Sequence, residues 1–203
     1  TKTYNVPKLS WRGFNGNFKR FLVVLGLFTL SNSSDSFLIL RARDAGVSVA
    51  IIPLLWAAHH ASKVVSSLLG GDLSDRLGRK RLIVSGWILY AAVYAGFAFA
   101  TQEFSIWVLF LIYGIYFGLV EGAEKALVAD LVRPEQRGTA YGLYNLAFGV
   151  TVLPASLLMG TIWDWKGPTT AFLVSAAMGS AAAMLLLIFV RTTSDDQMRT
   201  SQA

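Results

Sequence analysis

The sequence predicts an all-α membrane domain that crosses the bilayer with six helices. Apolar residues make up 54% of its 203 residues and come in runs of about twenty, the length that an α-helix needs to span a bilayer. Charged residues make up only 15%, against about a quarter in a soluble domain. The mean hydropathy of +0.52 agrees with this. A soluble domain is therefore excluded, and the net charge of +6 indicates basic loops between spans instead of a nucleic-acid surface.

Short polar links divide the apolar runs and set the domain boundaries. We expect a basic cytoplasmic linker at residues 1–20, a six-helix transmembrane domain at 21–190 and a cytoplasmic tail at 191–203. The predicted spans are residues 21–40, 49–70, 82–100, 105–127, 139–162 and 170–190. Most lysines and arginines fall in the linker, the tail and alternate links, which predicts a multi-pass protein of the inner or plasma membrane with both termini cytoplasmic. Because the chain begins at Thr1 without a cleavable signal pattern, we expect it to be a piece of a longer protein.

The first span carries a polar cluster in its middle. Ser31, Asn32 and Asp35 are spaced to share one face of a continuous helix. An ionised carboxylate that faced lipid at this depth would cost about 2.5–3.5 kcal/mol on insertion scales. We therefore expect this face to line a cavity inside the protein.

The second span also directs polar side chains to one side. Trp56, His60 and Lys63 fall in one sector of its helical wheel, with His59 beside them. A lysine within a span points to the protein interior. There Lys63 or His60 would either contact a substrate or pair with Asp35 for structural reasons. Adjacent histidines face different sides of a helix and no third ligand has a metal-site spacing, so no metal is predicted.

The fourth span combines a strip of glycines with three ionisable residues. The strip consists of Gly114, Gly118 and Gly122. Its spacing of four residues allows another helix to approach closely. Glu121 and Lys125 project near the strip as an i,i+4 pair, and Glu124 lies farther round the helix. Two interpretations stay open: these groups face a cavity, or they lie near the cytoplasmic end and reach water.

The other three spans carry few polar groups. In the third span, Tyr90 and Tyr94 either line the pathway or pack in the core, and core packing is the favoured interpretation. In the fifth span, Asn145 is a candidate contact for a substrate, and Pro154 is expected to bend the helix. The sixth span has no ionisable group and is interpreted as a packing helix.

Two links between the spans carry ordered motifs. Residues 71–81 read G-x-L-S-D-R-x-G-R-K-R, and we expect tight turns at Gly71 and Gly78. Residues 130–138 read D-L-V-x-P-E-x-R-G. Both motifs resemble links of the major facilitator superfamily of secondary transporters, which follow the second and the fourth helix of each six-helix half.

The resemblance covers residues 18–190 and implies the carboxy-terminal half of a transporter, with a 3+3 inverted repeat. It implies a proton-coupled, efflux-type permease that moves a small-molecule substrate by alternating access, without a cofactor and without nucleic acid. An amino-terminal six-helix half or a second copy would complete the cavity. A half-size membrane protein that dimerises or acts as a scaffold is the alternative. An intramembrane enzyme is disfavoured, because the histidines and glutamates of the spans lack a nucleophile.

The resemblance also implies a cytoplasmic gate, in which Asp75 meets the partner half and Arg79 pairs with Asp130. The gating set is Gly71, Asp75, Arg76, Gly78, Arg79, Lys80, Asp130 and Arg137. The candidate substrate and proton-coupling residues are Asn32, Asp35, His60, Lys63, Glu121, Glu124 and Asn145. Of these, Asp35 is favoured for coupling because it is the most central in its span.

Overall fold

A computed structural model describes residues 11–191 of the chain. Residues 1–10 and 192–203, which hold parts of the predicted linker and tail, lie outside the described residues. The α-helices are α1 (Gly16–Ser31), α2 (Ser36–Asp44), α3 (Ile52–Leu77), α4 (Arg79–Phe99), α5 (Glu103–Asp130), α6 (Arg137–Lys166) and α7 (Pro168–Phe189). Short 3-10 helices lie at Trp11–Gly13, Val49–Ile51 and Pro134–Gln136. Between residues 11 and 191 the structure has no strand, and the predicted all-α class is confirmed there.

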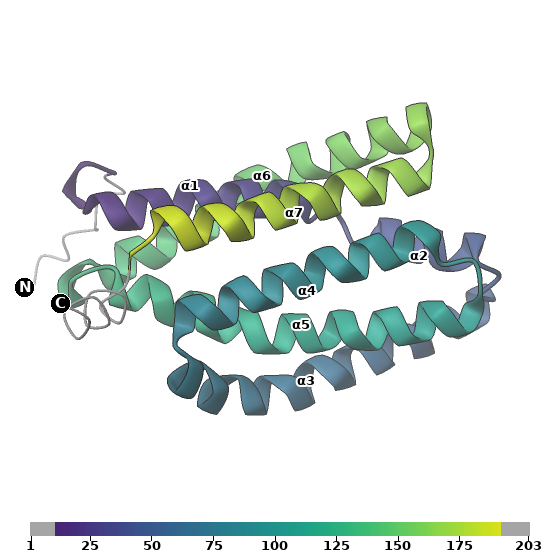
Figure 1. Ribbon diagram of the computed structural model, residues 1–203, viewed down its shortest axis with the longest axis horizontal. Coiled ribbons are helices and arrows are strands. Elements are labelled where there is room, and N and C mark those ends of the chain that lie inside the picture. Colours follow the sequence, from purple (N-terminus) through teal and green to yellow (C-terminus); the bar gives the residue numbers. More distant parts are fainter. Residues whose placement is uncertain (1–10, 192–203) are drawn as a thin grey trace, which may run out of the picture.

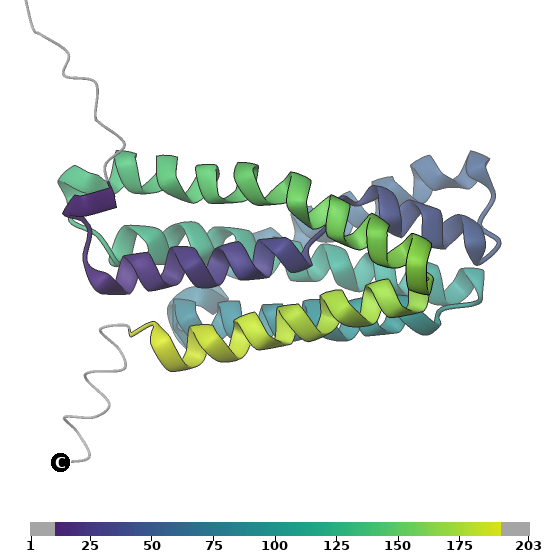
Figure 2. The same cartoon turned by 90° about the horizontal axis from the view of Figure 1, so that it is seen from above.

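The long helices form an elongated bundle of two layers (Figure 1). Helices α1, α6 and α7 make one layer, and α3, α4 and α5 make the other. The layers are joined mainly by α4 packing against α7. Figure 2 shows α6 crossing the top of the bundle and bending along its length, and Pro154 lies inside this continuous helix.

Both described ends of the chain lie at the same end of the bundle as the α3–α4 junction and the α5–α6 link (Figure 1). Two hydrogen bonds join the described chain ends to each other and to the α5–α6 link. Asn17 Nδ2 donates to the carbonyl of Arg191 at 2.7 Å, and Gln136 Nε2 donates to the carbonyl of Gly13 at 2.9 Å. The links richest in arginine therefore meet at one end, here called the basic end.

Five segments of the described chain are long and apolar enough to cross a membrane. They are Gly16–Asp44, Arg79–Phe99, Glu103–Asp130, Pro134–Lys166 and Pro168–Phe189. The second predicted span, residues 49–70, forms most of α3 but is not among the five. His59, His60, Lys63 and several serines lower its hydropathy. The predicted number of six spans is therefore not confirmed by length and composition.

The first predicted span, residues 21–40, lies within the apolar segment Gly16–Asp44, and its helix is interrupted there. Helix α1 ends at Ser31, and α2 begins at Ser36. Small polar side chains cause the break by bonding to the nearby backbone, as Ser34 Oγ does to the N–H of Ser36 at 3.3 Å. Asn32 and Asp35 consequently lie in the break and not on one helical face.

The helix also starts earlier than predicted, within the segment assigned to the linker. Asn15 caps α1 by accepting a hydrogen bond from the N–H of Phe18 at 2.8 Å. The apolar residue Phe18 is fully buried, so the first turn of α1 belongs to the core. The helix therefore begins about one turn before the predicted membrane boundary at residue 20, which stays a prediction.

The motif at residues 71–81 is mostly helical. Helix α3 continues to Leu77, supported by an i,i+4 ion pair of Asp72 with Arg76 at 3.0 Å. The only non-helical residue between α3 and α4 is Gly78, whose φ of +87° favours glycine. The tight turn expected at Gly78 is found, whereas the one expected at Gly71 is wrong because Gly71 lies inside α3.

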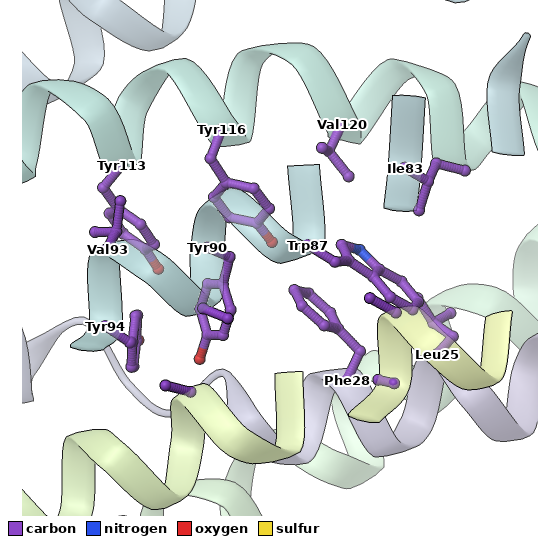
Figure 3. Close-up of a cluster of buried hydrophobic side chains, with 14 of the residues drawn as sticks. Leu25, Phe28, Ile83, Trp87, Tyr90, Val93, Tyr94, Tyr113, Tyr116 and Val120 are labelled. Carbon is purple, nitrogen blue, oxygen red and sulfur yellow. The ribbon is translucent and has the colours of Figure 1, made fainter. Parts of the chain in front are cut away.

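Aromatic side chains from α1, α4 and α5 fill the centre of the bundle (Figure 3). Phe28 stacks on Trp87 with ring centroids 4.1 Å apart, and Tyr90 packs against Tyr94 at 4.2 Å. The Tyr90 hydroxyl donates to the carbonyl of Ser31 at 2.6 Å, which satisfies a carbonyl at the end of α1. Tyr90 and Tyr94 are fully buried, as the interpretation of core packing requires.

Helix α3 packs along α5 through glycines. A Cβ atom at Gly114 would lie 2.5 Å from the carbonyl oxygen of His59, and one at Gly118 would overlap the carbonyl of Lys63. Around Gly122, in contrast, nothing lies within 4 Å of the Cβ position. Two of the three glycines of the predicted strip therefore form the close helix contact, and the third does not.

Candidate functional site

Five of the seven candidate site residues line one cavity between α1, α3, α5 and α6. They are Asn32, Lys63, Glu121, Glu124 and Asn145. The cavity has a volume of about 270 Å³, close to the lower end of the range for small-molecule sites. Aromatic rings complete its wall, contributed by Tyr116, Phe117, Tyr144 and Phe148. It therefore combines charged, amide and aromatic groups, which suits an organic solute.

A charged triad formed by Lys63, Glu121 and Lys125 lies in this wall. The Glu121 carboxylate bridges the two ammonium groups, with Oε2 2.9 Å from Lys63 Nζ and Oε1 2.8 Å from Lys125 Nζ. Lys63 also lies over the ring of Phe117, 4.8 Å from its centroid. The i,i+4 pair expected from the sequence is thus extended by a lysine from α3. Lys63 pairs with Glu121, so the alternative in which it pairs with Asp35 is wrong.

Glu124 is the most deeply buried carboxyl group of the cavity, with 4% of its surface exposed. The indole Nε1 of Trp87 donates to Oε1 at 2.9 Å, and the hydroxyl of Tyr144 lies 2.8 Å from Oε2. This carboxyl group therefore joins α4, α5 and α6. Its two partners were not identified from the sequence. The available signal was that a buried Trp or Tyr needs a polar partner.

The arrangement around Glu124 permits a change of protonation without loss of a hydrogen bond. An indole N–H can only donate, so Oε1 accepts in either state. A tyrosine hydroxyl can donate or accept. Tyr144 donates to the carboxylate, and after protonation it can accept the Oε2–H instead. Both hydrogen bonds of Glu124 can therefore be kept whether the carboxyl group is ionised or protonated.

Asn32 and Asp35 meet at a second polar centre, formed by tyrosines. The Tyr113 hydroxyl lies 3.1 Å from Asp35 Oδ1 and 3.2 Å from Asn32 Oδ1, so its single proton serves one acceptor at a time. The Tyr94 hydroxyl lies 3.4 Å from the same oxygen, Asn32 Oδ1. The break between α1 and α2 positions both acceptors towards α5. Asp35 is not among the residues that line the cavity.

The two histidines of α3 have different surroundings. His59 is buried and its Nδ1 lies 3.2 Å from the carbonyl of Phe110, which can only accept, so Nδ1 carries a proton. His60 is exposed and contacts Trp56 edge to face, and it lines a different cavity. His59 thus fixes α3 against α5, a role that the sequence did not indicate. Across residues 11–191 the structure brings together no group of three or more His, Asp or Glu that could hold a metal ion.

The second cavity, of about 560 Å³, runs from Lys63 towards the basic end between α3 and α5. Its wall includes Gly71, Asp75 and Arg79. Arg79 forms an ion pair with Asp130 and also donates to the carbonyl of Ala126 at 3.0 Å. The structure thus brings together the predicted pair of Arg79 and Asp130 at the junction of α4 with the end of α5.

The other described residues of the predicted gating set are not among the residues that line this cavity. Arg76 pairs with Asp72 inside α3, Gly78 makes the turn, and Lys80 is buried in the first turn of α4. Arg137 is exposed at the first residue of α6. The set therefore surrounds the α3–α4 junction and reaches the α5–α6 link.

Comparison with known proteins places this sequence among membrane transporters. The sequence profile of the Major Facilitator Superfamily matches residues 20–202. A protein of Methanocaldococcus jannaschii named as an uncharacterized MFS-type transporter is 38% identical over 189 residues, which are 90% of this chain and 45% of the relative. An inner membrane transport protein of Escherichia coli is 31% identical over 150 residues, 73% of this chain and 32% of the relative. A protein of Salmonella arizonae named as a multidrug resistance protein is 29% identical over 122 residues, 60% of this chain and 29% of the relative. The chain spans less than half of the length of these relatives.

Proposed function

This chain belongs to the major facilitator superfamily, and on that premise we propose that it forms one half of a secondary transporter that moves a small solute by alternating access. The family and the apolar helices indicate a multi-pass protein of the inner membrane, and transport rather than catalysis is the activity of such proteins. The observation that carries the proposal is the cavity walled by α1, α3, α5 and α6, in which charged and amide side chains face inward.

In this proposal α3 also crosses the membrane, in addition to the five apolar segments. The half then has six spans and the 3+3 inverted repeat of such transporters. Its 26 residues exceed the length needed to cross a bilayer, about 20. It runs beside α5 in the same layer (Figure 1), and the polar residues that lower its hydropathy, His59 and Lys63, contact α5. A helix whose polar face is covered by protein is tolerated in the membrane.

Proton coupling is proposed for the carboxyl groups of Glu124 and Asp35. Glu124 keeps both hydrogen bonds in either protonation state, as argued above, and it links three helices. Asp35 shares the Tyr113 hydroxyl with Asn32. Efflux is the proposed direction, supported by the relative named as a multidrug resistance protein.

The gate is proposed at the basic end, where the ion pair of Arg79 with Asp130 joins the start of α4 to the end of α5. Asp75, which is exposed beside the second cavity, would contact the partner half. An amino-terminal six-helix half is the proposed partner, because relatives are more than twice as long as the matched segment; a second copy is the alternative. The basic residues at this end favour a cytoplasmic location for it.

The test is flux through the full-length protein, including any segment that precedes Thr1, in proteoliposomes. Benzoate, glucose and ethidium serve as anionic, neutral and cationic probes. Glu124→Gln preserves an acceptor for Trp87 and a partner for Tyr144, so exchange without a gradient should persist while pH-driven accumulation is lost. Asp35→Asn is measured in parallel. Glu103→Gln, in the exposed first turn of α5, is the matched control and should leave both activities unchanged.

Three outcomes would count against the proposal. Accumulation that survives in both carboxyl variants would remove proton coupling through these groups. Loss of exchange as well as accumulation in Glu124→Gln would indicate a structural role for the carboxyl group. Absence of flux for every probe in the wild-type protein would favour a dimerising or scaffold module without transport.

A further inference from the structure

We propose that the triad of Lys63, Glu121 and Lys125 is a receptor for the anionic group of an aromatic substrate, so that the substrate class is aromatic carboxylates and related organic anions. This inference rests on the transport function proposed above and names the substrate of the same cavity. It is carried by the charge balance of the triad, by its exposure and by the rings beside it.

The triad has an excess of positive charge. Two ammonium groups face one carboxylate, and the single net positive charge lies in the cavity wall. Each ammonium has three N–H donors, and Glu121 occupies one donor of each. The remaining donors are available to the two oxygens of a ligand carboxylate.

The three side chains are open to the cavity. The exposed fraction is 32% for Lys63, 42% for Glu121 and 50% for Lys125. Ion pairs exposed to this degree contribute little to stability. Charges within a membrane helix are nevertheless costly and mark substrate pathways. Binding of a ligand explains the position of the triad better than stabilisation of the fold does.

Glu124, the other acidic group in the cavity, does not compete for the lysines. Both of its oxygens are engaged by Trp87 and Tyr144, and its side chain is buried although it lines the cavity. The remaining cavity groups are neutral, namely the amides of Asn32 and Asn145 and the aromatic rings. A carboxylate at the triad therefore meets no second exposed anion in this wall.

Aromatic rings beside the triad determine the rest of the substrate. Phe117 lies under the Lys63 ammonium, and Tyr116 and Phe148 line the same cavity. Aromatic pairs stack offset or edge to face and gain stability beyond the burial of their surface. A volume of about 270 Å³ accommodates a single substituted ring with its carboxylate on the triad.

The test measures binding of benzoate to the full-length protein in nanodiscs by calorimetry, with benzamide and benzylammonium as the neutral and cationic analogues. Wild type should bind benzoate at least about tenfold more tightly than either analogue, because hydrogen bonds to charged groups contribute most. Lys63→Gln and Lys125→Gln should each weaken benzoate binding about tenfold. Lys166→Gln is the control. It removes a lysine charge beside Trp165, at the last residue of α6, and should leave benzoate binding unchanged.

Glu121→Gln separates a receptor from a structural ion pair. In a receptor this substitution removes the competing carboxylate, raises the net charge of the triad and tightens benzoate binding several-fold. If benzoate binding is instead lost in a folded Glu121→Gln variant, the triad is structural and the proposal fails. Tighter binding of benzamide or benzylammonium than of benzoate to wild type would overturn it as well.

Flux measurements distinguish this inference from the function on which it rests. Transport of glucose or ethidium but not benzoate would refute the anion receptor and leave the transporter intact. Benzoate binding with the predicted response of the three variants, but without flux of any probe, would refute transport and retain the receptor.

Discussion

At the residue scale, the carboxyl groups between the helices each have a donor of a different kind. Glu124 has an indole and a hydroxyl, Asp35 has the hydroxyl of Tyr113, and Glu121 has two ammonium groups. Ionisable groups are tolerated inside a membrane protein when they are paired and face its interior. Among these three carboxyl groups, only Glu121 forms ion pairs, and this difference separates its role from the roles of Glu124 and Asp35.

The ion pair of Arg79 with Asp130 yields a prediction at this scale. The pair is partly exposed, so it contributes at most about 1 kcal/mol to folding. Its effect should appear in the balance between transporter states instead. Arg79→Asp should reduce flux strongly by placing two carboxylates together, and adding Asp130→Arg should restore a substantial part of it. Flux in proteoliposomes and thermal unfolding of each variant are the measurements.

Arg20→Asp supplies the control, because it changes the same charge on an exposed residue of α1 near the basic end. A double variant of Arg79 and Asp130 that is no better than either single variant would show that the pairing does not act in transport. If the variants that lose flux also unfold at a clearly lower temperature, the pair acts in folding.

At the element scale, the seam between α3 and α5 depends on backbone approach. The carbonyls of His59 and Lys63 lie against Gly114 and Gly118, and the side chains of His59 and Lys63 contact α5 at the same level. The close approach thus sets the position of the lysine that completes the triad. Packing of this kind by small residues is a main source of helix association in membranes.

Gly118→Ala tests this seam. The added methyl group would lie 2.7 Å from Cβ of Ser66 and 2.8 Å from the backbone N of Ser67, so α3 must move away. We expect a loss of stability of about 1–3 kcal/mol. Gly122→Ala, four residues along the same helix, meets nothing within 4 Å and should be neutral or stabilising by up to about 1 kcal/mol. Thermal unfolding in detergent compares the two, and equal effects would refute the seam.

The sequence predicts long elements better than their interruptions. Runs of apolar residues located the five segments that are long and apolar enough to cross a membrane, because a helix needs about twenty mostly apolar residues to span a bilayer. The break at residues 32–35 and the helical course through Gly71 depend on local hydrogen bonds and were missed. The partners of Glu124 were missed for another reason. Trp87 and Tyr144 approach it from α4 and α6, and such contacts arise only from packing.

At the scale of the whole molecule, the segment that contains α6 is the least buried of the five long apolar segments. In its most apolar stretch of 18 residues only 11% is buried, against 39–56% in the corresponding stretches of the other four segments. Exposed apolar side chains follow it, among them Val150, Leu153 and Leu157. The cavity lies on the side walled by α6 and α3, and a partner half placed there would close it. Lipid alone would leave the charged triad facing hydrocarbon, which is unfavourable.

The orientation of the whole molecule can be tested because the chain has no cysteine. Glu135 lies at the basic end in the α5–α6 link, and Asp164 lies near the opposite end of α6; both are exposed. Since loops rich in Lys and Arg stay in the cytoplasm, Asp164→Cys should react with an impermeant maleimide in intact cells. Glu135→Cys should react only after the cells are permeabilised. The reverse pattern would invert the proposed topology, and reaction of both in intact cells would mean that the chain does not cross the membrane between them.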